Sequence, residues 1–249
     1  RAYFPDDDEL EATQSQLETA LGHMRLMYPM STPVYRKVED DDWAEAWKAH
    51  YEPLRVGQRL VIRPLWIDLP LAADDIEIAL DPGMAFGTGS HPTTQLCLQA
   101  LEDLLQPAQS VLDLGSGSGI LSIAAAKLGA GRVLALDIDS IAVNATRENA
   151  QANGVGHKVK AERGSHDCLL SSARRFDLVI VNILARIIVE MANERLGEIV
   201  RSGGVAIFSG IIDTQVDEIE DALRNTGLQP YARRQMGDWM LVEARRPAE

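Results

Sequence analysis

A glycine-rich turn that joins a strand directly to a helix limits, more than any other feature, what this chain can fold into. Residues 111–114 are typical of a buried strand, and glycine follows at positions 115, 117 and 119 before an apolar helix begins at Ile120. Glycine in such a turn lets the backbone come close to a bound ligand. The segment therefore predicts a strand, loop and helix that together bind a ligand.

Strands and helices alternate with short joints from residue 94 onward, which predicts parallel strands connected by crossover helices. Several strands are almost continuously apolar, as expected when helices cover both faces of a sheet. The fold class predicted is α/β, with a mostly parallel sheet. The expected helices span 94–105, 120–130, 141–154, about 187–200, and 213–227. The expected strands span 60–67, 75–80, 110–115, 132–139, 159–164, 176–184 and 204–211. A closing hairpin is expected from two further strands at 228–236 and 239–246.

The first 70 residues carry weaker signals. Leu10, Leu17, Leu21 and Met24 recur at helical spacing, and residues 34–38 suit a short strand. Asp40–Asp42 can cap a helix that Pro53 ends. We therefore expect a small N-terminal part at 1–40, a linker helix and strand at 41–70, and the main domain at 71–249.

The 249 residues carry a formal net charge of -13. This charge disfavours sequence-independent binding to nucleic acid or to anionic lipid, and it favours a basic partner. No apolar run approaches the length of a membrane span, and the acidic N-terminus lacks the pattern of a secretory signal. The cysteines, Cys97 and Cys168, suit a reducing cytoplasm, and the scattered histidines predict no metal site.

An acidic residue ends the strand after the glycine loop. Asp137 lies 22 residues beyond Gly115, where a carboxylate can accept hydrogen bonds from both hydroxyls of an adenosine ribose. The dinucleotide pattern G-x-G-x-x-G fails from either start, because Ile120 occupies a position that requires glycine and Ser122 a position that requires glycine or alanine. This weakens a nicotinamide-dependent dehydrogenase as an alternative. The D-x-G-x-G-x-G loop with the later acid resembles class I S-adenosylmethionine-dependent methyltransferases.

Two further acids leave alternatives open. Asp113 either steadies the loop by accepting backbone N–H groups or approaches the cationic amino group of the ligand. Asp167 either receives the adenine amino group or is an ordinary solvated acid.

Two more motifs flank the glycine loop. Upstream lies Asp-Pro-Gly-Met-Ala-Phe-Gly-Thr-Gly-Ser-His-Pro-Thr-Thr at 81–94, and downstream lies Asn-Ile-Leu-Ala at 182–185. With these motifs the chain resembles, over residues 34–249, the PrmA family, which methylates large-subunit ribosomal protein L11 in bacteria. The resemblance implies a Rossmann-like class I methyltransferase fold, with a mostly parallel sheet of seven strands and helices on both faces. A small, incomplete α+β domain that recognises the substrate is expected to precede it. The resemblance also implies S-adenosylmethionine as cofactor and the basic protein L11 as partner.

Carried over position by position, the resemblance implies that four residues contact S-adenosylmethionine, with Phe86 and Gly117 as further contacts. The four are Thr94, Gly115, Asp137 and Asn182. The residues themselves support part of this, because Thr94 lies at the start of a predicted helix, where hydroxyl and N–H groups suit a carboxylate.

Asn182 is the candidate catalytic residue. A lysine amine has a reference pKa of about 10.4, so near neutrality it is protonated and has no free lone pair to accept a methyl group. The side-chain carbonyl of Asn182, helped by the main-chain carbonyls of Ile183 or Leu184, can accept N–H bonds from a neutral amine and aim its lone pair. His91 has a suitable reference pKa for a general base, but a histidine at a helix start needs no catalytic task.

The chain departs from the family pattern after residue 185. The family continues with a small or acidic residue and proline, whereas Arg186, Ile187 and Ile188 stand here. The rim of the acceptor pocket is therefore expected to differ. This keeps open a lysine methyltransferase with the same fold that acts on another protein, such as an electron-transfer flavoprotein subunit. A binding module that retains the cofactor fold without catalytic activity is a separate alternative.

Overall fold

The structure is a computed structural model that describes residues 52–81, 89–172 and 174–248, together with Leu10, Thr13, Leu17 and Leu21. The chain forms two compact units, residues 1–49 and 50–249. The four described residues of the first unit are helical, which confirms the prediction for Leu10, Leu17 and Leu21; Met24 lies outside the described residues. The predicted strand at 34–38 and the linker helix lie outside the described residues, and the expected domain boundaries stay a prediction.

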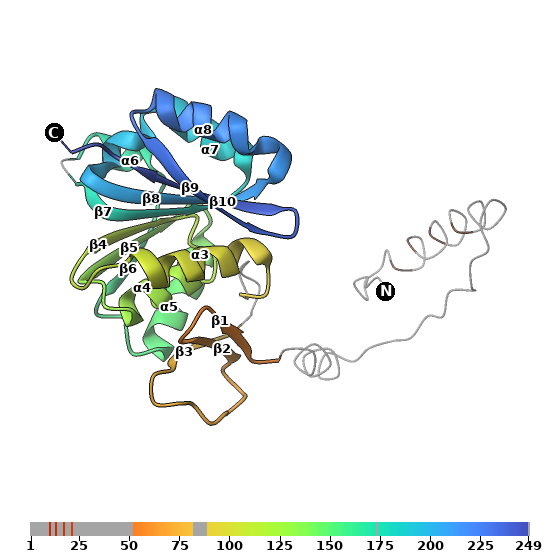
Figure 1. Ribbon diagram of the computed structural model, residues 1–249. Helices are drawn as coiled ribbons and strands as arrows, with labels where there is room; N and C mark the ends of the chain where they lie inside the picture. Colours follow the sequence, from red (N-terminus) through yellow and green to blue (C-terminus); the bar gives the residue numbers. More distant parts are fainter. Residues whose placement is uncertain are drawn as a thin grey trace. The chain divides into compact units, whose positions relative to one another are not determined.

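A seven-stranded sheet forms the centre of the second unit (Figure 1). Strands β4 to β8 pair in parallel, and β10 runs antiparallel to both of its neighbours. The chain moves outward from β4 and then returns to its other side at β7, the kind of position where α/β sheets bind ligands. In spatial order the strands are β6 (Val159–Arg163), β5 (Arg132–Asp137), β4 (Ser110–Leu114), β7 (Phe176–Asn182), β8 (Val200–Ile212), β10 (Trp239–Arg245) and β9 (Gln229–Met236). The predicted seven-stranded, mostly parallel sheet and its closing hairpin are confirmed.

Helices cover both faces of this sheet because side chains alternate along each strand. Val111 of β4 belongs to the apolar cluster under three helices, and Leu112 belongs to the cluster on the opposite face. The first set is α3 (Pro92–Leu104), α4 (Ile120–Lys127) and α5 (Ser140–Ala152); the second is α6 (Asp167–Leu170), α7 (Ala185–Asn193) and α8 (Val216–Asn225), with the short 3-10 helices η1 (Leu196–Ile199) and η2 (Asp213–Gln215).

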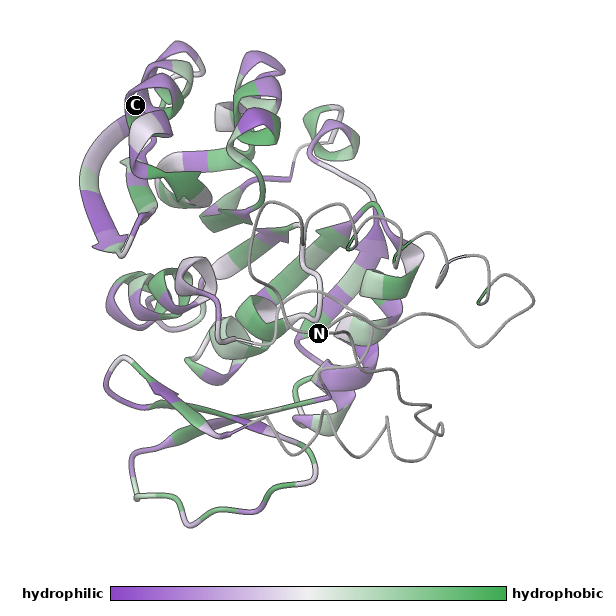
Figure 2. Ribbon diagram, turned by 90° about the vertical axis from the view of Figure 1, so that its right-hand side faces the viewer, coloured by the Kyte–Doolittle hydropathy of each residue, from purple (hydrophilic) through white to green (hydrophobic). Residues whose placement is uncertain are grey.

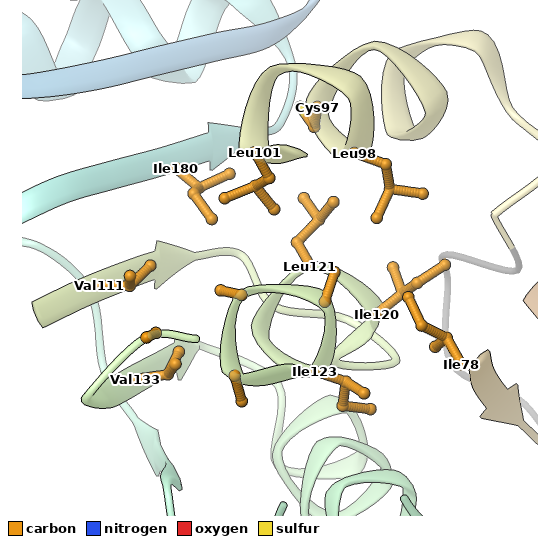
Figure 3. Close-up of a cluster of buried hydrophobic side chains, with 14 of the residues drawn as sticks. Ile78, Cys97, Leu98, Leu101, Val111, Ile120, Leu121, Ile123, Val133 and Ile180 are labelled. Carbon is orange, nitrogen blue, oxygen red and sulfur yellow. The ribbon is translucent and has the colours of Figure 1, made fainter. Parts of the chain in front are cut away.

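Hydrophobic residues recur along the strands and helices of these layers (Figure 2), and their buried side chains form the core. Figure 3 shows Leu98 and Leu101 of α3 pointing toward Leu121 of α4 and the strand residues Val111 and Ile180. Each such side chain contributes about 1.5–3 kcal/mol when it is removed from water. The sheet is thereby a rigid platform for whatever its edge carries.

A second, three-stranded sheet precedes the first helix of this unit. It consists of β1 (Leu54–Val56), β2 (Leu60–Pro64) and β3 (Ile76–Leu80), with β2 antiparallel to β1 and parallel to β3. The sequence predicted β2 and β3, although β2 ends earlier than expected, and β1 was missed. Asn153 of α5 joins this sheet to the main domain, because its side-chain amide bonds both the N–H and the carbonyl of Ala79.

The helix predicted at about 187–200 is present, but its predicted bounds are wrong. Helix α7 spans Ala185–Asn193, and Arg195 then adopts a φ of 69°, which a continuing right-handed helix does not allow. The 3-10 turn that follows keeps Leu196 and Ile199 buried, so the apolar spacing continued although the α-helix had ended. Strand β8 accordingly begins at Val200, earlier than the predicted 204.

Candidate functional site

Three predicted site residues lie side by side at the carboxyl edge of the large sheet. Strand β4 pairs in register with β5 on one side and with β7 on the other. The residue after β4 and the last residues of its two neighbours are therefore level with one another. These residues are Gly115, Asp137 and Asn182.

The loop between β4 and α4 depends on its glycines. Gly115, Gly117 and Gly119 have φ values of 76°, 54° and 83°, in the left-handed region that residues with a Cβ rarely adopt. A Cβ on Gly119 would also lie 2.8 Å from the Thr146 side chain of α5. The loop therefore brings its backbone to the sheet edge with no side chain in between at these three positions.

Asp137 holds the same loop. One carboxylate oxygen accepts the N–H of Gly117 at 2.9 Å, and the other accepts the N–H of Asp139 at 3.0 Å. A carboxylate has about four acceptor positions, so these two bonds leave positions free for hydroxyl donors. Asp137 is half-buried at the end of β5, so its carboxylate is fixed in place while part of it stays accessible.

Asp113 is fully buried beneath the loop. One carboxylate oxygen accepts the Ser122 hydroxyl at 2.6 Å, and the side chain also receives the Ser122 backbone N–H in the first turn of α4. The other oxygen has no hydrogen-bond partner among the described residues. Burial raises the pKa of Asp113 from 3.8 to about 6, although the Ser122 bonds oppose the rise. The residue thus steadies the helix start and keeps one oxygen available to a donor.

Helix α3 brings Thr94 to the site region. Thr94 is buried in the first turn, and its N–H bonds the carbonyl of His91 at 3.0 Å. His91 caps the helix, since its Nδ1 lies 2.8 Å from the Thr93 hydroxyl and accepts the Thr93 N–H at 3.3 Å. Its ring also packs edge-on against Trp239, with centroids 4.7 Å apart. These contacts explain His91 as a cap and offer no support for a general base.

The segment before α3 approaches the glycine loop at Gly89. A Cβ on Gly89 would lie 2.9 Å from Ile120, the first residue of α4. Phe86, the other predicted contact in this segment, lies outside the described residues. Asp167 is exposed as the first residue of α6, a position that suits either of its two interpretations.

Asn182 ends β7 half-buried, and among the residues that the structure describes its side chain makes no hydrogen bond. Leu184, two residues on, is 68% exposed and precedes the first residue of α7. Arg186 is exposed and pairs with Glu190 one turn later, at 3.1 Å. Within the described part of the chain, no group engages the Asn182 amide, while Leu184 beyond it is exposed.

Two polar residues of α5 that support the loop were missed. Thr146 is fully buried; its hydroxyl donates to the Gly117 carbonyl at 3.0 Å and lies 3.1 Å from the Ser116 hydroxyl. The Asn149 amide donates to the Ser118 carbonyl at 2.9 Å. Their spacing of three residues on an otherwise apolar helix face was the available signal, because buried polar groups need partners.

Other kinds of site find no support in the described part of the chain. No three His, Cys, Asp or Glu residues there cluster in a way that could hold a metal ion. None of the described helices combines the length and the apolar character that a membrane crossing requires.

Comparison with known proteins identifies the family. The family model described as "Ribosomal protein L11 methyltransferase (PrmA)" matches residues 1–247. The chain belongs to this family. The match begins well before residue 34, where the resemblance was expected to start. A ribosomal protein L11 methyltransferase of Chloroflexus aurantiacus is 43% identical over 271 residues, covering 99% of this chain and 82% of the relative. One from Listeria monocytogenes serotype 4a is 44% identical, covering 100% of this chain and 80% of the relative.

A solved structure of the same family agrees in fold. The ribosomal protein L11 methylase of Lactobacillus delbrueckii subsp. bulgaricus superimposes with a TM-score of 0.71 at 37% identity, covering 79% of this chain and 100% of that one. This chain therefore has the class I methyltransferase fold that its motifs predicted.

Proposed function

We propose that the chain transfers methyl groups from S-adenosylmethionine to lysine side-chain and N-terminal amines of ribosomal protein L11. Its family and the names of its relatives support this substrate. The observation that carries the proposal is the alignment of Asn182 with Gly115 at the sheet edge, because it sets an amine-binding oxygen beside a loop built for close ligand approach.

The residues present fit the cofactor. The glycine loop offers backbone at close range, Asp137 has free acceptor positions for ribose hydroxyls, and the unpartnered oxygen of Asp113 suits a cationic amino group. Thr94, Phe86 and Asn182 complete the proposed set of cofactor contacts, together with Gly115 and Gly117. Bound there, S-adenosylmethionine supplies an electrophilic methyl carbon on a sulfonium.

The chain's own task is to select and aim a neutral amine. Asn182 accepts an N–H from the amine through its side-chain oxygen, and the main-chain carbonyl of Ile183 or Leu184 accepts another. Both bonds leave the nitrogen lone pair free, and together they fix its direction. An ammonium group has no lone pair, so only the neutral amine can react.

Asn182 achieves this without exchanging a proton, since an amide does not titrate in this range. His91 is engaged as a helix cap by Thr93. We therefore assign proton loss from the lysine to solvent, before the amine enters the site.

The charge of the chain suits this partner. A net charge of -13 attracts a basic ribosomal protein and speeds its encounter with the enzyme. The same charge is the reason that we expect no direct contact with nucleic acid. The proposed substrate places the reaction in the cytoplasm.

Mass spectrometry of intact and digested L11 after incubation with the chain and S-adenosylmethionine tests the proposal. We expect mass increments of whole methyl groups on lysine and N-terminal amines of L11. A parallel incubation with an electron-transfer flavoprotein subunit covers the alternative substrate. Methylation of that subunit with L11 unchanged would contradict the proposed substrate, and S-adenosylmethionine left unbound in calorimetry would contradict methyl transfer itself.

A further inference from the structure

Strand β8 contains a glycine at the point where it passes the end of β7. Gly210 has a φ of 86° and lies between Ser209 and Ile211, which pair with consecutive residues of β10 across a register shift. One extra residue with left-handed backbone forms a β-bulge, a position that favours glycine. The bulge adjoins the candidate site, because Ser209 also pairs with Asn182 in the parallel ladder.

The space that a side chain on Gly210 would need is filled by the peptide backbone after Asn182. A Cβ on Gly210 would overlap the carbonyl oxygen of Ile183, and it would lie 2.7 Å from the carbonyl carbon and 3.2 Å from the nitrogen of the same residue. These atoms are backbone, so they cannot swing aside as the end of a flexible side chain can. The bulge thus determines where this carbonyl group stands.

The other side of Ile183 is confined as well. A Cβ on Gly115 would lie 2.5 Å from Cγ2 of Ile183. Ile183 is therefore held between two left-handed glycines, one in the cofactor loop and one in β8. A side chain on Gly210 would displace the Ile183 backbone and with it the segment that carries Asn182, whereas a side chain on Gly115 would meet only side-chain atoms of Ile183.

The bulge is anchored independently of any ligand. Ser209 is fully buried, and its hydroxyl donates to the Met240 carbonyl of β10 at 3.1 Å. The Ser209 side chain also forms a hydrogen bond with Cys97 of α3. Because β10 and α3 both belong to the packed core, the position of Gly210 is set by the fold.

We infer that Gly210 is a positioning residue for methyl transfer, because its bulge places the Ile183 carbonyl and the Asn182 amide where they meet the acceptor amine. This inference rests on the proposed function, since it concerns the acceptor side of that site. Any side chain at position 210 pushes the Ile183 peptide out of place. A misplacement of about 1 Å in a reacting geometry can lower a rate about a hundredfold.

Gly203 provides a matched control in the same strand. It has a φ of 77°, but a Cβ there would meet no atom within 4 Å. Gly210→Ala and Gly203→Ala therefore share the cost of a left-handed alanine, and only the first forces the Ile183 peptide to move. The experiment measures kcat on L11, the dissociation constant of S-adenosylmethionine and the thermal midpoint for both variants.

We expect Gly210→Ala to lower kcat at least about tenfold more than Gly203→Ala does. We expect the two variants to bind S-adenosylmethionine alike, a split between turnover and binding that general destabilisation does not produce. Equal kcat values in the two variants, with active wild-type chain, would overturn the inference and leave the proposed function intact. Wild-type chain that leaves every amine of L11 unmethylated would overturn both.

Ser209→Ala provides the second test if Gly210→Ala does not fold. It removes the hydroxyl that anchors the bulge to β10 and introduces no clash. We expect kcat to fall about fivefold, the effect of one ordinary hydrogen bond, with cofactor affinity unchanged. Wild-type kcat in this folded variant would overturn the inference.

Discussion

The proposed site has two halves: a cofactor half, formed by the glycine loop and Asp137, and an acceptor half, formed by Asn182 and the residues that follow it. The halves differ in how much of their geometry the fold has already fixed. On the cofactor half, Asp137, Thr146 and Asn149 bind the backbone of the glycine loop from two directions. On the acceptor half, the Asn182 side chain makes no hydrogen bond within the described part of the chain, and exposed Leu184 follows it. The backbone there is nevertheless confined by Gly210, and the Ile183 side chain is confined by Gly115.

This difference indicates a division of labour. A site that binds the same cofactor in every cycle gains from a loop that needs no reorganisation, because rigid contacts lower the entropy cost of binding. A site that receives several amines of a protein needs a fixed backbone with an unengaged polar group. Changes on the two halves should therefore affect different measured quantities.

The largest effect is expected from Asn182→Ala. Removing the oxygen that aims the amine should lower kcat about a hundredfold, because the reacting geometry is lost. Calorimetry should show a much smaller loss of S-adenosylmethionine affinity, because the glycine loop and Asp137 still hold the cofactor. Asn193→Ala, an exposed change at the end of α7, serves as control. Wild-type turnover in the Asn182 variant would remove the acceptor half from the account.

The next effect is expected from Asp137→Asn, on binding. The change removes a charged acceptor that holds the Gly117 N–H and faces the ribose, so S-adenosylmethionine affinity should fall between about tenfold and a hundredfold. Asp139→Ala is the neighbouring control, since it removes only a bond to the Ile141 N–H at the start of α5. Equal affinity in the Asp137 variant and the control would refute the ribose assignment.

The third prediction concerns how the free energy of unfolding depends on pH through Asp113, which lies buried beneath the glycine loop. Burial raises the pKa of Asp113 to about 6, so the folded chain binds this proton more tightly than the unfolded chain does. The contribution of Asp113 to the free energy of unfolding therefore falls as pH rises from about 4 to 6, by a few kcal/mol, and stays low above that window.

Urea unfolding of Asp113→Asn across this range tests the effect. The variant should lack this part of the slope, because an amide does not titrate. Asp221→Asn alters an exposed acid paired with Arg224 and should keep the wild-type slope. An Asp113 variant whose slope equals that of wild type would show that the buried carboxyl does not titrate in the window.

The smallest effect is expected from Thr146→Val, which keeps the shape of the side chain and removes its bond to the Gly117 carbonyl. S-adenosylmethionine affinity should fall about fivefold, with kcat unchanged at saturating cofactor. A fall in kcat alone would show that the two halves are coupled through the loop.

The sequence predicted the strands of the seven-stranded sheet and the site residues at their ends. Apolar runs mark buried parallel strands, and the motif residues follow those runs directly. Gly115, Asp137 and Asn182 could be assigned to one edge for that reason. Thr146 could not, because its role depends on the rotation of α5 about its own axis, which spacing alone does not define.

Two features that were missed or predicted wrongly depend on backbone conformation and strand pairing that the local sequence does not show. The end of α7 depends on one left-handed residue, Arg195, and nothing in the local sequence distinguishes it from its helical neighbours. The bulge at Gly210 exists because β8 pairs with β10 on one side and with β7 on the other, and this register is invisible along the chain.

The distance from the Asn182 side-chain oxygen to the acceptor nitrogen tests the central claim most directly. It can be measured in a crystal structure of the chain with S-adenosylhomocysteine and a lysine-containing peptide of L11. We predict a hydrogen bond of about 3 Å, with the adenosine resting on the glycine loop and Asp137. A ligand bound elsewhere, or an Asn182 side chain turned away from the amine, would contradict the account.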